Sequence, residues 1–195
     1  RDVYKRQAYV QVANAGIVNS VSCGERFTCV LRSDGTVWGV GQNTNGQLGD
    51  GTVTTAGAFV RMANVSNAVA LACGGTHTLV LRADGTVWAA GKNSSGQLGD
   101  NSATQRTAAV QTNLTNVAAV AAGYEHSCLV RSDGTVWTMG NNGNGRLGDG
   151  TFVNRISPTQ MGGVTGAIAA AGGYFHTAVL KSDGTIVSAG DTMSG

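Results

Sequence analysis

Three histidines are the residues of this chain best suited to metal binding or proton transfer. His77, His126 and His176 occupy one position in three similar stretches, each three residues after a glycine. A neutral imidazole can bind a metal or act as a general base, but a catalytic histidine is needed only once. Recurrence at one position therefore favours a structural role, in which each histidine hydrogen-bonds a neighbouring loop. The alternative is a metal site formed by all three.

The four cysteines also follow a repeat. Cys23 and Cys73 share one repeat position, and Cys29 and Cys128 share another. The five-residue gap between Cys23 and Cys29 is unlike the spacings of zinc sites. Equivalent positions in neighbouring repeats are seldom close enough for a disulfide. We therefore expect the cysteines to act as small core residues.

The acidic residues give no catalytic arrangement either. After residue 7 most of them recur, either in Asp-Gly pairs or in a glycine-rich loop, and only Glu25, Glu125 and Asp191 do not. Nothing in the sequence pairs two of these three as glycoside chemistry would require. The glycine-rich loops lack the Gly-Lys-Ser/Thr of a phosphate-binding loop. The sequence therefore assigns no catalytic, cofactor-binding or metal-binding residue, and we expect a protein that is not an enzyme.

A repeat of about 50 residues positions all of these side chains. The stretch LRADGTVWAAGKNSSGQLGDN at 81–101 recurs at 31–51 and 130–150, and in part at 180–195, so that the Asp-Gly pairs begin at 34, 84, 133 and 183. A fixed period of this length indicates a repeat architecture. Within a single repeat domain over 8–195 we place a partial blade at 8–23, complete repeats at 24–73, 74–122 and 123–172, and a partial repeat at 173–195.

Each complete repeat predicts four short β-strands. In the second, apolar runs predict strands at 69–73, 77–82 and 86–90, with a weaker strand near 107–112. The Asp84-Gly85 pair between two such runs indicates a hairpin turn. Four strands per repeat of this length suit a blade of a β-propeller. A β-solenoid is the alternative, but its coils are usually shorter, roughly 20–30 residues, and a β-sandwich requires no repeat.

Composition and charge exclude other classes. Charged residues make 12% of the 195 residues, and the net charge of +2 resides in Arg1, Lys5 and Arg6 against Asp2. Without a basic stripe to neutralise phosphates, no nucleic-acid partner is expected. No apolar run approaches the ~18 residues of a membrane-spanning helix, so no membrane insertion is expected.

The first seven residues, RDVYKRQ, match nothing in the repeats. They look like translated adapter sequence, so we treat residues 1–7 as a leader that does not belong to the native protein. No apolar segment typical of a signal peptide follows them. We therefore expect the native N-terminus to be missing.

The repeat unit itself resembles that of a known family. The pattern G-x-x-H-T-x-V-L-x-x-D-G-T-V-W-x-x-G-x-N-x-x-G-Q-L-G-D-G is similar to the regulator of chromosome condensation repeat, and the resemblance covers residues 8–195. Phe27 departs from it at the histidine position, and Val187 departs at the tryptophan position. The resemblance implies a seven-bladed propeller, which needs about 350 residues. We therefore expect an incomplete arc of about four four-stranded blades, a fragment of a longer propeller whose open ends favour self-association.

The resemblance also implies a function. Members from bacteria look like secreted or cell-surface recognition modules, so we expect a scaffold that binds another protein, with an extracellular or surface location favoured. Guanine-nucleotide exchange on a small GTPase with chromatin docking, as in the eukaryotic member, is the first alternative. A propeller lyase or hydrolase is the second.

Strand direction predicts where a partner binds. Because strands alternate in direction, the G-x-x-H and N-x-x-G loops should share one face, opposite the Asp-Gly turns. The Asp-Gly turns barely vary, whereas the loops on the other face do, and exposed aromatic residues beside charges are typical of interfaces. The sequence therefore predicts a partner-binding surface of six residues: Glu25, Arg26, Tyr124, Glu125, Tyr174 and Phe175.

Overall fold

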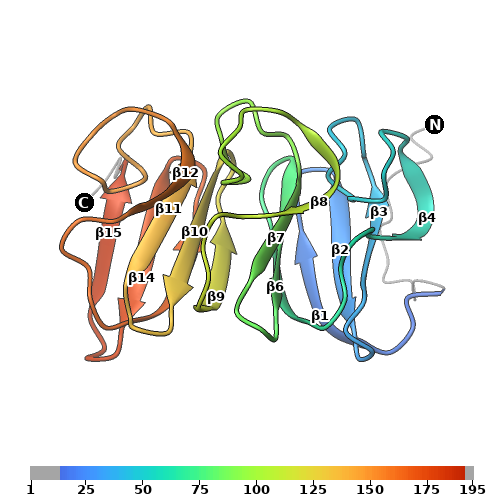
Figure 1. The fold of residues 1–195 in the computed structure, drawn as a ribbon, viewed down its shortest axis with the longest axis horizontal. Coiled ribbons are helices and arrows are strands. Elements are labelled where there is room, and N and C mark those ends of the chain that lie inside the picture. Colours follow the sequence, from blue (N-terminus) through green and yellow to red (C-terminus); the bar gives the residue numbers. More distant parts are fainter. Residues whose placement is uncertain (1–13, 192–195) are drawn as a thin grey trace, which may run out of the picture.

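The computed structural model describes residues 14–191, and the leader and the first part of the partial blade lie outside this range. Four antiparallel sheets stand side by side, each a meander of consecutive strands (Figure 1). We call them blades 1 to 4. Blade 1 comprises β1 (Val18–Cys23), β2 (Phe27–Arg32), β3 (Val37–Gly41) and β4 (Ala56–Arg61). Blade 2 comprises β5 (Ala68–Cys73), β6 (His77–Arg82), β7 (Val87–Gly91) and β8 (Arg106–Gln111). Blade 3 comprises β9 (Val117–Ala122), β10 (His126–Arg131), β11 (Val136–Gly140) and β12 (Arg155–Gln160), and blade 4 comprises β13 (Ala167–Gly172), β14 (His176–Lys181) and β15 (Ile186–Gly190).

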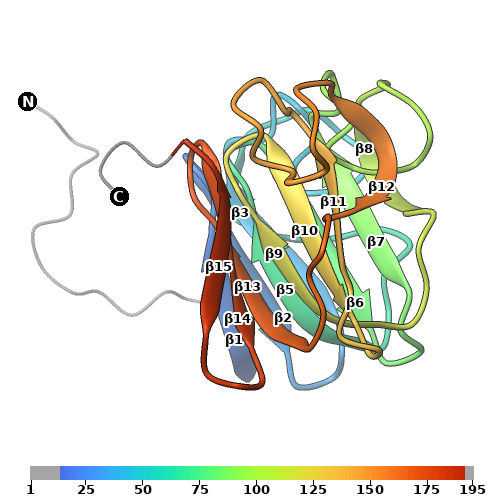
Figure 2. The ribbon, with the colours of Figure 1, turned by 90° about the vertical axis from the view of Figure 1, so that its left-hand side faces the viewer.

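The first strands of successive blades lie next to each other along the inside of the arc. Contacts run from β1 to β5, from β5 to β9 and from β9 to β13. Figure 2 views this arc from the blade 4 end. Blades 1 and 4 lie at opposite ends of the row (Figure 1), so the described sheets do not close into a ring. No helix in residues 14–191 is long and apolar enough to cross a membrane.

The two ends of the arc differ. The sequence repeats divide the chain at residue 23, but Val18–Cys23 pairs with β2, so blade 1 has four strands. Within the described range, blade 4 ends at β15 with three strands. A sequence repeat counted from glycine to glycine therefore covers three strands of one blade and the first strand of the next.

The core lies between blades rather than within them. One cluster joins blades 1 and 2 around Leu48, Met62 and Val80, all at most 1% exposed. Similar clusters join blades 2 and 3, and blades 3 and 4. Alternating side chains of each strand reach opposite faces of the sheet, so blades 2 and 3 each supply apolar residues to the layers on both of their sides. Burial of this apolar surface, in three separate layers, holds the arc together.

The three tryptophans share one repeat position but differ in what they pack against. Trp88 packs against the cluster between blades 1 and 2, and Trp137 against the cluster between blades 2 and 3, but both are only partly buried. Trp38 has no preceding blade in the described range, and the Arg32 guanidinium lies 3.8 Å from the centre of its ring. Each indole lies two residues after a turn threonine, and the indole N–H donates to that threonine hydroxyl at 2.9 Å in Trp38 and at 3.1 Å in Trp137.

The Asp-Gly turns are structural, as predicted. Asp84 accepts hydrogen bonds from the backbone N–H of Thr86 at 3.0 Å and from its hydroxyl at 2.6 Å. These bonds hold the pKa of Asp84 below its usual value. Gly85 has a φ of +76°, which glycine adopts without strain, and its carbonyl accepts from Val117 N of the next blade at 3.0 Å. The turns therefore both reverse the chain and fasten adjacent blades.

Candidate protein-binding surface

The G-x-x-H and N-x-x-G loops lie at the same end of each of blades 1 to 3, as strand direction predicts. Lys92 N, at the start of the second loop, donates to Thr76 O in the first at 3.0 Å, and the equivalent bond joins Asn141 N to Glu125 O at 2.9 Å. The Asp-Gly turns lie at the opposite end. We call the end that carries these two loop types the loop face.

The glycine of each G-x-x-H loop is required because the imidazole lies against it. A Cβ atom at Gly74 would overlap the ring of His77, and one at Gly123 would overlap the ring of His126. In blade 1 the ring of Phe27 takes the same place over its glycine. The motif therefore stacks a planar side chain onto bare backbone, which gives the loop face a rigid base.

The histidines connect each blade to the next. His77 Nε2 lies 3.0 Å from Ser127 Oγ, and Ser127 Oγ donates its proton to Gln97 O at 2.7 Å. Because that hydroxyl proton is used, His77 Nε2 carries a proton and is the donor. His126 Nε2 bonds Thr177 Oγ1 in the same way at 2.9 Å. In the part of the chain that the structure describes, no group of three or more His, Cys, Asp or Glu residues could hold a metal ion.

Burial keeps these histidines neutral. Desolvation lowers the pKa of His77 to about 4 and the pKa of His126 to about 3. A neutral imidazole with Nε2 protonated has one donor, and that donor is used between the blades. The geometry therefore assigns both residues to structure rather than to proton transfer.

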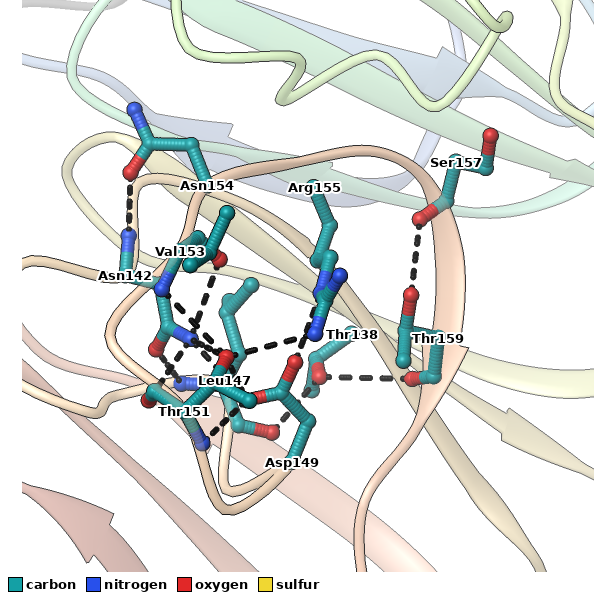
Figure 3. A network of polar contacts seen from close by, with 10 residues as sticks. All are labelled: Thr138, Asn142, Leu147, Asp149, Thr151, Val153, Asn154, Arg155, Ser157 and Thr159. Atoms are coloured by element: carbon teal, nitrogen blue, oxygen red, sulfur yellow. Dashed lines mark hydrogen bonds and ion pairs between the residues drawn. The ribbon is translucent and has the colours of Figure 1, made fainter.

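The N-x-x-G loops are ordered by a buried asparagine. Asn142 Nδ2 donates to Asp149 Oδ1 at 3.0 Å, and its Oδ1 accepts from Leu147 N at 3.0 Å (Figure 3). Arg155 Nε donates to Asp149 Oδ2 at 2.7 Å, and hydrogen bonds to Arg155 and Thr151 bring the pKa of Asp149 to about 2 despite burial. Leu147 is fully buried beneath the loop, as are its equivalents Leu48 and Leu98. The second loop of the loop face is therefore as fixed as the first.

Backbone hydrogen bonds join the G-x-x-H loops of neighbouring blades. Glu25 N donates to Gly75 O at 3.2 Å, Gly75 N to Tyr124 O at 3.0 Å, and Tyr124 N to Gly173 O at 3.1 Å. These bonds form a belt around the inner edge of the loop face. Side chains from distant repeats are thereby placed beside one another.

Four of the six predicted residues meet on this belt. Tyr124 and Tyr174 stack with ring centroids 4.0 Å apart and planes 13° from parallel, and Phe175 meets Tyr174 edge-on at 4.3 Å. The Tyr124 hydroxyl donates to Glu25 Oε2 at 2.9 Å. That carboxylate acceptor raises the pKa of Tyr124 to about 12. We call Glu25, Tyr124, Tyr174 and Phe175 the aromatic surface.

The other two predicted residues flank the aromatic surface. Arg26 lies beside Glu25, with Nε 4.0 Å from Oε1. Glu125 turns away to Lys92, whose Nζ lies 2.5 Å from Oε1, and also accepts from Asn141 at 3.2 Å. The ammonium group of Lys92 keeps the pKa of Glu125 below its usual value. Glu125 therefore fixes the position of neighbouring loops and contributes less free charge to a partner than Glu25.

A shallow cavity of about 380 Å³ opens beside the aromatic surface, where the inner strands end. Its floor is glycine backbone from all four blades, with Cys23, Cys73 and Ala122, and Glu25, Tyr124 and Tyr174 form its rim. Cys23 is exposed here, so the expectation that every cysteine is a core residue fails for it, because blade 1 has no described neighbour on that side. Cys29, Cys73 and Cys128 are buried, and the four cysteines are free thiols.

One member of this region was missed from the sequence. The Arg146 guanidinium lies 5.0 Å from the centre of the Phe175 ring and donates to Tyr174 O at 3.1 Å. Burial lowers the pKa of Arg146, while Glu125 opposes this effect. The available signal was a break in the repeat, since Arg146 stands where other repeats have Gln47 and Gln97.

Comparison with known proteins places these loops in a family. Two models of the regulator of chromosome condensation (RCC1) repeat match the chain, one over residues 18–47, 68–97 and 117–146, and the other over 34–81, 84–130 and 133–180. The chain belongs to the RCC1 repeat family. The resemblance seen in the sequence is thereby confirmed. None of the curated proteins compared with the chain matches it.

Solved structures of RCC1-type propellers confirm the fold. Human WBSCR16 is 27% identical with a TM-score of 0.81, and the match covers 89% of this chain and 47% of that protein. Yeast RCC1 (Prp20) bound to Kap60 is 20% identical, with a TM-score of 0.77 and coverages of 89% and 43%. Prp20p from Saccharomyces cerevisiae, in a study of its binding to Gsp1p and histones, is also 20% identical, with a TM-score of 0.79 and coverages of 89% and 45%. The chain thus spans a little under half the length of these RCC1-type proteins.

Proposed function

We propose that this chain is a non-enzymatic scaffold that binds another protein through the aromatic surface of its loop face. The observation that carries the proposal is the continuous stack of Tyr124, Tyr174 and Phe175, which comes from two blades and remains open to solvent. Tyr174 is 52% exposed and Phe175 is 42% exposed. Clustered exposed aromatic side chains with a carboxylate at the edge match the composition of interface hot spots.

The rigid base beneath this surface favours binding. Tyr124 is held by its backbone bond to Gly173, by its hydroxyl bond to Glu25 and by stacking on Tyr174. Tyr174 is held in turn by Arg146. A side chain that is already ordered loses less conformational entropy when a partner docks, so more of the contact energy contributes to affinity.

The states of the polar groups support a role without catalysis. Glu25 accepts a hydrogen bond from Tyr124, Glu125 is paired with Lys92, and His77 is buried and neutral. Each group is occupied by a structural partner. The family relationship supports a protein partner, since the Prp20 structures are described with Kap60, Gsp1p and histones.

Comparative affinity capture tests the proposal. The wild-type chain, a Tyr124→Ala/Tyr174→Ala variant and an Arg82→Ala/Arg131→Ala variant are immobilised at equal density, and captured proteins are quantified. The arginines lie beside Asp-Gly turns at the opposite end and serve as the control. We expect a protein that is retained by the wild type and the arginine variant and lost from the tyrosine variant. Capture that depends on the arginines and not on the tyrosines would contradict the proposal.

A further inference from the structure

Within residues 14–191, the contact between blades 1 and 2 lacks the histidine bond that joins the later blades. His77 and His126 each donate to a hydroxyl of the next blade. The equivalent hydroxyl on blade 2 is that of Thr78, which donates its proton to Gln47 O at 2.7 Å. Blade 1 carries Phe27 at the histidine position, and a phenyl ring has no N–H to donate. The Thr78 oxygen is therefore left without an imidazole donor.

Two thiols take the place of the missing imidazole. Cys29 Sγ lies 3.8 Å from Thr78 Oγ1, and Cys73 Sγ lies 3.9 Å from the same oxygen. Cys73 is the cross-strand partner of Thr78 within blade 2, whereas Cys29 reaches the hydroxyl from β2 of blade 1. Because the hydroxyl proton is already donated, each thiol is placed to donate to the oxygen. Cysteines of two different blades thereby converge on one atom.

Among the contacts between the described blades, only this one brings two cysteines together. The equivalent residues are Leu79 and Ala122 between blades 2 and 3, and Cys128 and Gly172 between blades 3 and 4. The loss of the histidine therefore coincides with the gain of a pair of thiols. Cys128 has no second thiol across its contact, and burial alone raises its pKa to about 12.

The two thiols differ in their access to solvent and in their acidity. Cys29 is fully buried, whereas Cys73 is 9% exposed and lines the cavity of about 380 Å³ on the loop face. Hydrogen bonding with Cys73, followed by burial, holds the pKa of Cys29 well above its usual value. Hydrogen bonding from Cys29 lowers the pKa of Cys73, although burial opposes this effect. Since the thiolate is the attacking form of cysteine, Cys73 is the thiol that reacts first with a reagent in the cavity.

We propose that Cys29 and Cys73 form a reversible disulfide that links blade 1 to blade 2 when the protein meets a small-molecule disulfide. The Cys73 thiolate attacks one sulfur of the reagent, whose own S–S bond breaks and whose first half leaves as a thiolate. The Cys29 sulfur then attacks the Cys73 sulfur of this mixed disulfide, and the second half of the reagent leaves. The two released thiolates take up the protons of the two cysteines. The protein pair is oxidised by two electrons, and the reagent is reduced to two thiols.

The new bond lies directly beneath the loop face. Cys73 precedes Gly74 and Gly75, and Gly75 O accepts from Glu25 N at 3.2 Å while Gly75 N donates to Tyr124 O at 3.0 Å. The disulfide therefore fixes the belt where it crosses from blade 1 to blade 2. Under oxidising conditions it supplies the connection between blades that a histidine supplies elsewhere.

Oxidation with glutathione disulfide, followed by peptide mapping, tests the proposal. The chain carries Cys23→Ser, which removes the exposed thiol, and the remaining free thiols are alkylated after acid quenching and unfolding. Cleavage after arginine places Cys29 in the peptide 27–32 and Cys73 in the peptide 62–82. We expect these two peptides to be joined and the thermal midpoint to rise by about 5–10 °C, a typical effect of one disulfide in a chain of this size. Dithiothreitol should reverse both changes.

Three variants locate the effect. Cys29→Ala and Cys73→Ala introduce the residue that Ala178 and Ala122 provide at the same repeat positions, so both should fold, and neither midpoint should rise on oxidation. Cys128→Ala, the matched control, removes a buried thiol that has no second thiol across its contact, and it should respond as the parent does. Unlinked peptides after equilibration, a link between separate copies, or the same rise of the midpoint in Cys73→Ala would each overturn the proposal.

Discussion

The hydroxyl of Tyr124 donates to the Glu25 carboxylate at 2.9 Å, although 99 residues and the whole of blade 2 separate the two in sequence. Blade 2 contributes Gly75 between them, and a Cβ atom there would lie 2.6 Å from the Tyr124 ring. The small residue in blade 2 therefore lets the side chains of blades 1 and 3 meet. This bond defines the orientation of the aromatic surface.

Tyr124→Phe separates that bond from the stacking. The variant keeps the ring against Tyr174 and removes only the donor to Glu25. We expect the free energy of unfolding to change little, because this group is close to solvent. Partner affinity should fall by no more than about 1 kcal/mol, because the bond lies within the chain and contributes only by holding the ring in place before a partner docks. Calorimetric titration with the captured partner, alongside Tyr124→Ala, measures the difference. An effect of Tyr124→Phe equal to that of Tyr124→Ala would show that stacking contributes nothing.

The buried histidines predict that stability falls in mild acid. The unfolded chain binds a proton at each histidine near pH 6.5, whereas the folded pKa of His77 is about 4 and that of His126 about 3. Their stabilising contribution is therefore complete above pH 6.5 and is lost as the pH falls towards 4. Over this range the free energy of unfolding should fall by about 1.4 kcal/mol per pH unit for each histidine. Denaturant titrations between pH 7 and pH 4.5 measure it.

The matched variant for that experiment is His77→Phe. Phenylalanine occupies the equivalent position in blade 1, where Phe27 packs over its glycine. The variant should fold, and its free energy of unfolding should fall less steeply as the pH is lowered, because one histidine no longer contributes. An unchanged slope would mean that other groups cause the acid sensitivity.

Gly123→Ala tests the motif at the base of the loop face. An added Cβ would overlap the His126 ring and lie 2.7 Å from Gly173 O, so the loop or the imidazole must move. We expect a loss of about 1–3 kcal/mol, typical of an overpacked site. The control is Gly57→Ala in β4, where a Cβ meets nothing within 4 Å. Thermal unfolding compares the two, and equal midpoints would refute the packing role of Gly123.

Trp88→Ala and Trp38→Ala should differ because only Trp88 has a preceding blade to pack on. Large-to-small changes of buried tryptophan cost about 3–5 kcal/mol. Since Trp88 is partly exposed, we expect a smaller loss of about 2–3 kcal/mol, at or below the lower end of that range. Trp38→Ala should cost less, because the ring contacts Arg32 rather than an apolar cluster. Equal losses in denaturant unfolding would contradict the assignment of Trp88 to the layer between blades.

The fold could be predicted because each repeat carries its own turn and strand signals. Asp84-Gly85 and the apolar runs on both sides of it determine the hairpin, and the predicted strand 77–82 agrees with β6. The structure at the ends of the arc was harder to predict. The strand Val18–Cys23 completes blade 1, which was not foreseen because the glycine-to-glycine repeat divides each blade after its first strand.

The site could be predicted only in part. Strand direction placed Glu25, Tyr124 and Tyr174 on one face, but it gave no distances between blades. The pairing of Glu125 with Lys92 depends on the path of two loops, and that path follows from the belt of backbone bonds rather than from local sequence. Arg146 was visible only as an exception to the repeat.

The most direct test is the dissociation constant of the captured partner for three forms of the chain: wild type, Tyr124→Ala/Tyr174→Ala and Arg82→Ala/Arg131→Ala. We expect the tyrosine changes to weaken binding by at least ~2 kcal/mol, roughly 30-fold, because hot-spot aromatic residues are removed. The arginine changes should leave the constant within about twofold, less than ~0.5 kcal/mol. Unchanged affinity in the tyrosine variant, with loss in the arginine variant, would contradict the assignment of binding to the loop face.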